Sequence, residues 1–141
     1  MAPPAVPGSF PFPLVLQHVG GRGYQLQQDF AYVTRAGRVF TAPAGFITDG
    51  GSVPRILWPL YPPFGSDNDE AYVVHDYLYA HAETFEGNDN GHLSRANADA
   101  VMLEIMEVKG FRTTGRRTVW SGVRAGGWVA WRRHRQARKR L

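Results

Sequence analysis

Two helix-forming segments with clear start and stop signals most constrain the fold of this chain. Ser66 is a predicted N-cap, and the acidic residues after it suit a first helical turn, where the helix dipole favours negative charge. We expect this helix to end near His81 or the residue after it. A polar, glycine-containing loop follows, and then Ser94 caps a second helix that Gly110 ends.

The segments around these helices predict a mixed architecture. Residues 24–34 and 38–46 have strand-like composition and are joined by a turn at 35–37, which predicts a β-hairpin. Proline and glycine in residues 47–65 indicate a fixed, irregular loop. A third helical segment begins near Thr114. We therefore expect an α+β fold with a small β-hairpin and two or three packed helices.

Length and composition set the domain organisation. At 141 residues the chain suits one domain, and five prolines among the first 13 residues predict an extended arm. We expect a Pro-rich arm over 1–13, a globular domain over 14–131 and a basic tail over 132–141. The absence of cysteine excludes disulfides and thiolate zinc sites. The sequence predicts neither a signal peptide nor a transmembrane segment.

Charge is divided unevenly along the chain. Residues 1–111 hold all 12 acids and 6 of the 16 basic residues, a net charge of −6, whereas residues 112–141 hold the other 10 basic residues, a net charge of +10. Such a basic end favours an anionic partner. Charge alone does not show whether that partner is phospholipid, nucleic acid or an acidic protein surface. The predicted membrane or partner contacts are Trp128, Trp131, Arg132, Arg133 and Arg135.

Two residues on the apolar faces of the predicted helices could do chemistry. Successive helical residues are about 100° apart, which places His75 on the apolar face of the first helix and turns Asp76 toward its edge. Asp99 lies on the apolar face of the second helix, where a carboxylate needs a partner. If Asp99 holds one nitrogen of His75, the other nitrogen can take a proton from water.

Simpler interpretations stand beside this one. A single helical histidine is more often a packed or surface residue than a base. Asp99 has an alternative partner in Arg95, one turn earlier on the same helix. Asp49-Gly50 is a common turn dipeptide. The combination favours a site, because separate segments supply a loop oxygen, a helical carboxylate, a base and an orienting acid.

The residues of this candidate site limit which metal ion it could bind. The chain has no His-Glu-x-x-His pattern, so zinc is poorly supported. Asp49 and Asp76, with a loop carbonyl from Gly50 or Gly51, suit a hard cation, calcium before magnesium. Phosphate-binding loops and nucleophile elbows of the known patterns are not found in the sequence.

An ordered set of motifs resembles an uncharacterised domain family that is common in tailed bacteriophages and prophages. The resemblance covers about residues 25–130 and implies a phage origin, with a location in the virion or the infected bacterial cell. The motifs that carry it are Pro43-Ala44-Gly45-Phe46-Ile47-Thr48-Asp49-Gly50-Gly51-Ser52-Val53-Pro54-Arg55, Pro62-Pro63-Phe64-Gly65, His75-Asp76-Tyr77-Leu78-Tyr79 and Arg95-Ala96-Asn97-Ala98-Asp99.

The same landmarks are similar to the secreted phospholipase A2 superfamily, especially its small bacterial members, and imply a helical pair of that type. The resemblance rests on an Asp-Gly-x-Ser-like calcium loop and a helical His-Asp-x-x-Tyr motif. It implies that His75 is the general base, that Asp49 and Asp76 bind Ca²⁺ and that Asp99 orients the histidine. Tyr79 matches the tyrosine of the helical motif.

Three functions follow as hypotheses. The first is a calcium-dependent hydrolase of phospholipase A2 type that acts at a membrane. The second is a non-enzymatic virion component, such as a tail, baseplate or connector protein, which contacts other virion proteins or copies of itself. The third is nucleic-acid binding through residues 112–141, ranked last because no recognition motif is found.

Overall fold

The computed structural model describes residues 6–49, 54–57, 59 and 69–139 of the chain, except the side chains of 55, 138 and 139. The chain divides into two compact units, Met1–Asp49 and Gly50–Leu141, and each unit is considered by itself. The first unit holds small antiparallel sheets, and the second is mainly helical. The predicted α+β class is confirmed.

The first unit consists of short strands in two sheets. A three-stranded antiparallel sheet has the order β1-β2-β5, and a two-stranded sheet pairs β3 with β4. The strands are β1 (Leu16–Gly20), β2 (Gly23–Leu26), β3 (Phe30–Val33), β4 (Val39–Ala42) and β5 (Ile47–Thr48).

The predicted hairpin exists, but it is shorter than expected. Phe30 pairs with Ala42 and Val33 with Val39, and Gly37 takes a φ of 90° in the turn between them, a conformation that glycine adopts without strain. The prediction of one strand over 24–34 was wrong, because the chain leaves β2 after Leu26 and pairs that strand with β1 and β5 instead. Strand-like composition does not show where one strand ends and another begins.

The described part of the Pro-rich arm packs on the hairpin. The backbone of Ser9 forms an antiparallel bridge with Val33, and its carbonyl accepts a hydrogen bond from the Val33 amide at 2.9 Å. The ring of Phe10 stacks on Phe30, with 5.5 Å between the ring centroids, and lies 5.0 Å from Tyr32. These contacts hold residues 6–13 on the first unit.

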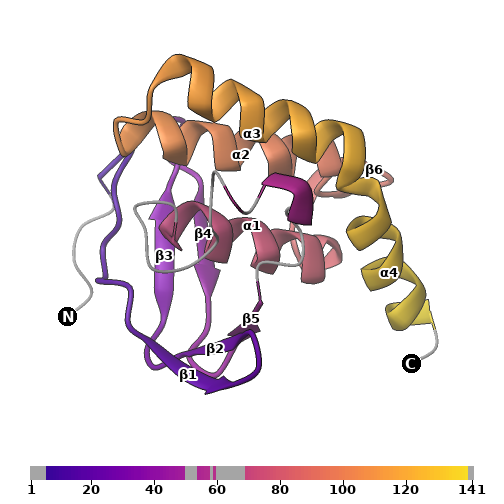
Figure 1. Cartoon of the computed structure of the whole chain (residues 1–141), viewed down its shortest axis with the longest axis horizontal. Coiled ribbons are helices and arrows are strands. Elements are labelled where there is room, and N and C mark those ends of the chain that lie inside the picture. The colour runs from indigo at the N-terminus through magenta and orange to yellow at the C-terminus, as the bar shows by residue number, and fades with distance from the viewer. Residues whose placement is uncertain (1–5, 50–53, 58, 60–68, 140–141) are drawn as a thin grey trace. The chain divides into compact units, whose positions relative to one another are not determined.

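The second unit is built from four α-helices (Figure 1). Helix α1 packs on both α2 and α4, while α3 packs on α2 and α4. Its elements are η1 (Arg55–Leu57), α1 (Asp69–Ala80), η2 (Ala82–Thr84), β6 (Glu86–Asp89), α2 (Arg95–Val108), α3 (Thr113–Gly126) and α4 (Trp128–Lys139).

The predicted ends of the second helix are confirmed by its capping contacts. The Ser94 side chain accepts a hydrogen bond from the Asn97 amide at 3.1 Å, and the helix closes before Gly110, which has a φ of 83°. The first helix begins at Asp69, and the predicted cap Ser66 lies outside the described residues.

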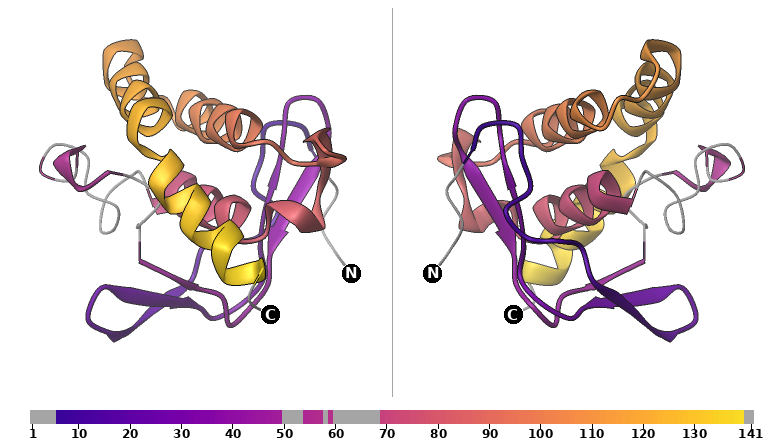
Figure 2. Two further views of the ribbon diagram at one scale, coloured as in Figure 1. Left: turned by 90° about the vertical axis from the view of Figure 1, so that its right-hand side faces the viewer. Right: turned by 90° about the vertical axis from the view of Figure 1, so that its left-hand side faces the viewer.

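The predicted third helix is two helices. The break lies at Gly127, where α3 ends and α4 begins in a new direction (Figure 2). Residues 132–139 of the predicted basic tail belong to α4 and form its C-terminal part. Within the described ranges, no helix combines the length and the apolar character needed to cross a bilayer.

The core of the second unit surrounds α1. Eight of its twelve residues are buried, from Ala71 to Asp76 without interruption and again at Leu78 and Tyr79. Such near-complete burial is unusual for an amphipathic surface helix and marks α1 as the central element of the unit. Met102 and Met106 of α2 are fully buried as well.

Candidate functional site

A buried carboxylate, Asp99 of α2, is the centre of the candidate site. Its Oδ1 accepts hydrogen bonds from His75 Nε2 at 2.7 Å and from the Tyr79 hydroxyl at 2.6 Å. Its Oδ2 accepts from Arg124 Nη1 at 2.8 Å and from Arg95 Nη1 at 3.5 Å. The carboxylate therefore links three helices, α1, α2 and α3.

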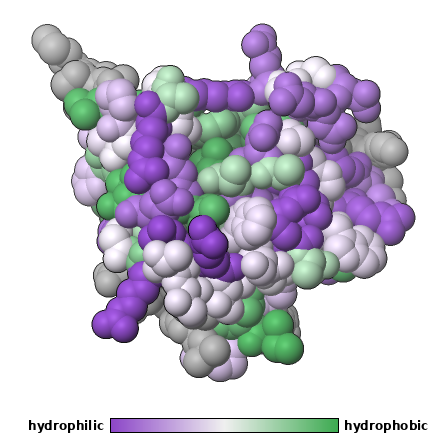
Figure 3. All heavy atoms as spheres, turned by 90° about the horizontal axis from the view of Figure 1, so that it is seen from above, coloured by the Kyte–Doolittle hydropathy of each residue, from purple (hydrophilic) through white to green (hydrophobic). Residues whose placement is uncertain are grey.

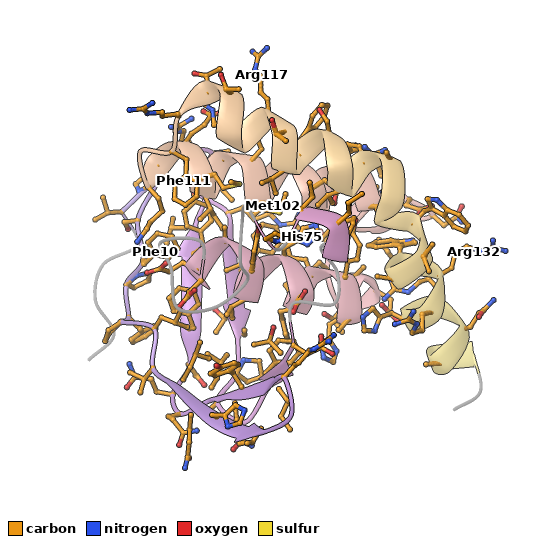
Figure 4. All side chains as sticks on the ribbon, in the orientation of Figure 1. Phe10, His75, Met102, Phe111, Arg117 and Arg132 are labelled. Atoms are coloured by element: carbon orange, nitrogen blue, oxygen red, sulfur yellow. The ribbon has the colours of Figure 1, made fainter. Side chains whose placement is uncertain are left out.

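Helix α1 presents both of its donors from one face. His75 and Tyr79 are four residues apart, so their side chains are neighbours on the helix surface, and their ring centroids lie 4.2 Å apart. Both side chains are fully buried (Figure 4 labels His75 in the interior). An ionised Asp99 has no proton to give, so His75 Nε2 is the donor in this bond and Nδ1 is the remaining ring nitrogen.

The alternative pairing of Asp99 with Arg95 is also present. Arg95 does more than contact this carboxylate: its guanidinium donates to the carbonyls of Val123 and Arg124, both at 3.1 Å. These carbonyls belong to the last turn of α3, where a positive charge offsets the helix dipole. The two predicted interactions of Asp99 thus occur together.

The neighbours of Asp99 decide its protonation state. Burial alone would raise the pKa of this carboxyl, but the hydrogen bond and charge of His75, then the hydrogen bonds from Tyr79 and Arg124, hold its pKa below the usual value. Burial, followed by the charge of Asp99, raises the pKa of the Tyr79 hydroxyl far above its usual value. Near neutral pH, Asp99 is an anion and Tyr79 is a hydrogen-bond donor.

The joint between α3 and α4 packs directly on Tyr79. A Cβ at Gly127 would meet the Tyr79 hydroxyl at 2.7 Å, closer than real Cβ contacts. Trp131 of α4 lies edge-on to the Tyr79 ring, with 5.2 Å between centroids. Arg135 donates to the Tyr79 carbonyl at 2.6 Å and pairs with Glu83 at 3.0 Å. Helix α4 therefore closes one side of the site.

The predicted calcium ligands Asp76 and Asp49 differ in burial and belong to different units of the chain. Asp76 was predicted at the helix edge and is in fact buried, with 6% of its surface exposed, because α1 is covered nearly all round. Asp49 is exposed at the end of the other unit. Gly50 and Ser52 lie outside the described residues, as does the side chain of Arg55.

Metal-binding potential is limited in the described part of the chain. There, no group of three or more His, Cys, Asp or Glu side chains could hold a metal ion. Asp76 offers carboxylate oxygens, which are hard ligands suited to Ca²⁺. The other ligands of the predicted site, Asp49 and a loop carbonyl, are also oxygen donors, so the donor types fit calcium.

The predicted contact residues of α4 fall on two faces. Trp131 and Arg135 face α1, as described above, and the Arg135 guanidinium lies 4.5 Å from the Trp131 ring centroid. Trp128 is 46% exposed and Arg132 and Arg133 are exposed, with Arg132 directed outward in Figure 4. Of the predicted contact residues, Trp128, Arg132 and Arg133 therefore lie on the outward side of α4.

Sequence reasoning missed two residues of the site. Arg124 was counted only as part of the basic region, and nothing in the sequence pairs it with Asp99, 25 positions away. Gly127 belongs to a Gly126-Gly127 pair inside a helical pattern, a signal for a close approach that was not used.

Comparison with known proteins gives one family. No curated protein and no solved structure matches the chain. The model of one protein family, described as Protein of unknown function (DUF1353), matches residues 24–123, which include His75, Tyr79 and Asp99. Because this match spans more than half of the sequence, the chain belongs to the DUF1353 family.

Proposed function

We propose that this protein is a phage-encoded hydrolase of phospholipase A2 type, in which His75 activates water for attack on an ester. The observation that carries the proposal is the 2.7 Å hydrogen bond between His75 Nε2 and Asp99 Oδ1. It fixes the imidazole so that Nδ1 is the nitrogen that can accept a proton. The phage origin rests on the sequence motifs described above.

The reaction uses one imidazole as base and then as acid. A water gives its proton to Nδ1 of His75 while its oxygen attacks the ester carbonyl carbon. The bond to the leaving alcohol then breaks, and the imidazolium returns the proton to that alcohol. His75 is fully buried, so the proposal requires a path by which water and the ester reach Nδ1.

Asp99 would act by positioning His75. Its charge is shared with Arg124 and Arg95, at 2.8 and 3.5 Å, which weakens its attraction for an imidazolium. Its Oδ1 nevertheless holds the ring of His75 and the hydroxyl of Tyr79 in fixed places. Orientation is therefore its larger contribution.

Calcium completes the proposal. Asp76 and Asp49 would hold the ion, together with the Gly50 carbonyl. When bound, Ca²⁺ supplies a positive charge that polarises the ester carbonyl and offsets developing negative charge.

The test is fatty-acid release from phospholipid vesicles by the full chain, with calcium or with EDTA. Replacing His75 by glutamine should lower the rate about 100-fold or more, the usual contribution of a general base. His92→Gln is the matched control, because His92 is exposed in the same unit. Background release by the wild type under both conditions, or equal rates for the two variants, would reject the proposal.

A structural role is the second candidate, and the burial of the site favours it. A carboxylate with donors on both oxygens beside a fully buried histidine also describes a cross-link between helices. We propose as the alternative a virion component, such as a tail, baseplate or connector protein. Mass spectrometry of purified particles decides this, because absence of the chain from the virion excludes it.

A further inference from the structure

A hollow at the seam between α2 and α3 is separate from the Asp99 cluster. Leu103 of α2 lines it together with three residues of α3, Arg117, Trp120 and Ser121. Its volume is about 320 Å³, which lies at the lower end of the range for small-molecule sites. Seen from above in Figure 3, apolar surface lies between hydrophilic side chains on the face that α3 occupies in Figure 1.

The lining combines an apolar floor with a polar rim. Trp120 and Ser121 follow Arg117 by three and four residues, so the three side chains share one face of α3. Leu103 and Trp120 are half-buried, whereas Arg117 and Ser121 are exposed. Arg117 extends outward from α3 in Figure 4.

The charge at this rim is not neutralised by the described part of the protein. No ion pair or hydrogen bond of the Arg117 side chain occurs among the described residues. Its neighbour Arg116 differs, since it donates to the Phe111 carbonyl at 2.9 Å and lies 3.9 Å from Glu107. Glu107 is thus next to Arg116, and within the described part of the chain Arg117 keeps its charge for an anion from solution.

We propose that this hollow binds a small amphiphilic carboxylate, with its apolar chain on Leu103 and Trp120 and its carboxylate on Arg117 and Ser121. The guanidinium and the hydroxyl both donate hydrogen bonds to a carboxylate. The single guanidinium of Arg117 and the volume of about 320 Å³ suit one monomeric carboxylate ligand. The inference does not depend on the proposed hydrolase, because it concerns binding at another place in the helical unit.

Titration of the full chain with decanoate, below its micellar concentration, tests the proposal by calorimetry. Decanoate should bind saturably with one site per chain. Decanol, which lacks the charge, and acetate, which lacks the chain, should each bind at least about tenfold more weakly. Equal binding of decanol and decanoate overturns the proposal, and so does an absence of saturable decanoate binding.

Variants locate the site. Arg117→Gln should weaken decanoate binding about tenfold through loss of the charge-assisted hydrogen bond, while Arg132→Gln, which removes another exposed arginine, should leave it unchanged. If both variants weaken decanoate binding equally, decanoate is attracted by general positive charge and does not bind in the hollow. Decanoate should also alter the tryptophan fluorescence of a Trp128→Phe variant, because this variant keeps Trp120. The same fluorescence change should be lost in Trp120→Phe. If it persists there, Trp120 does not line the binding site.

A lipid bilayer also presents anionic groups next to apolar chains, as decanoate does. Vesicles containing anionic phospholipid present many head groups together, and monomeric decanoate presents one. Binding that occurs only with vesicles, and is equally sensitive to Arg117 and Arg132, overturns the proposed monomer site and indicates a membrane-contact surface instead.

Discussion

Six arginines of the second unit fall into two groups with opposite surroundings. The inner arginines, Arg95, Arg124 and Arg135, donate to carbonyls or to the Asp99 carboxylate, at distances from 2.6 to 3.5 Å. The outer arginines, which are Arg117, Arg132 and Arg133, are exposed. The same residue type therefore organises the interior at some positions and leaves positive charge at the surface at others.

This difference changes how the basic end of the chain is understood. Residues 112–141 look like a solvated positive segment when only charge is counted. In the structure, Arg124 and Arg135 satisfy polar groups at helix ends or in the core, where an unmatched partner is costly. These two arginines are therefore not available to an external anion, so the effective charge of this surface is smaller than +10 suggests.

The largest expected effect is the removal of the anion that the inner group surrounds. Asp99→Ala leaves Arg124 and His75 without their shared acceptor, and we expect a loss of about 3–5 kcal/mol in the free energy of unfolding. Asp89→Ala, at an exposed position of β6, should change it by less than about 0.5 kcal/mol. Urea unfolding followed by far-UV circular dichroism measures both, and similar values would show that the cluster is not a stabilising cross-link.

A paired comparison of two arginines sharpens the contrast directly. Arg124→Gln removes the 2.8 Å bond to Asp99 and should lower the free energy of unfolding by about 1.5 kcal/mol, as expected for a hydrogen bond to a charged group. Arg117→Gln should stay within about 0.5 kcal/mol of the wild type. If the ranking is reversed in urea melts, the division into inner and outer arginines is wrong.

Acid should weaken the inner group selectively. The pKa of Asp99 is lower in the folded than in the unfolded chain, so its contribution to stability is complete above the unfolded value, near 4, and disappears as the pH falls through the folded value. Asp99→Asn should therefore show a shallower loss of stability below pH 4 than the wild type. Thermal melts from pH 2 to 7 measure the slope, and Asp89→Asn should retain the wild-type slope.

The smallest effect on stability is expected at the outward face of α4. Replacing both Arg132 and Arg133 by glutamine should alter the free energy of unfolding by less than about 0.5 kcal/mol. If this face contacts anionic membranes, each lost charge removes about 1 kcal/mol of binding, and co-sedimentation with acidic vesicles should fall. Unchanged, salt-independent sedimentation would argue against a membrane role for these arginines.

The parts of the fold that sequence could predict are those with local signals. Ser94 and Gly110 bound the second helix through contacts within a few residues. The turn at Gly37 likewise depends on neighbours. The division between β2 and β3 could not be predicted, because it depends on pairing with β1 and β5.

The candidate site divides in the same way. Helical periodicity placed His75 and Asp99 on apolar faces, and their hydrogen bond is present at 2.7 Å. Periodicity also predicted Asp76 at an edge, which is wrong because α1 is buried on nearly all sides. The contact of Arg124 with Asp99 was beyond prediction, since it requires knowing how α3 crosses α2. The catalytic and calcium-binding roles stay predictions.

Gly127 has a consequence for variation at the joint between α3 and α4. With the Tyr79 hydroxyl 2.7 Å from where a Cβ would lie, even alanine must push aside a group whose hydrogen bond to Asp99 is buried. A library of all substitutions at this position should therefore yield almost only glycine among folded clones. Gly126, whose Cβ would meet Pro54 at 3.1 Å, should accept alanine more readily. A single methyl group at position 127 is therefore expected to prevent the joint between α3 and α4 from packing on Tyr79.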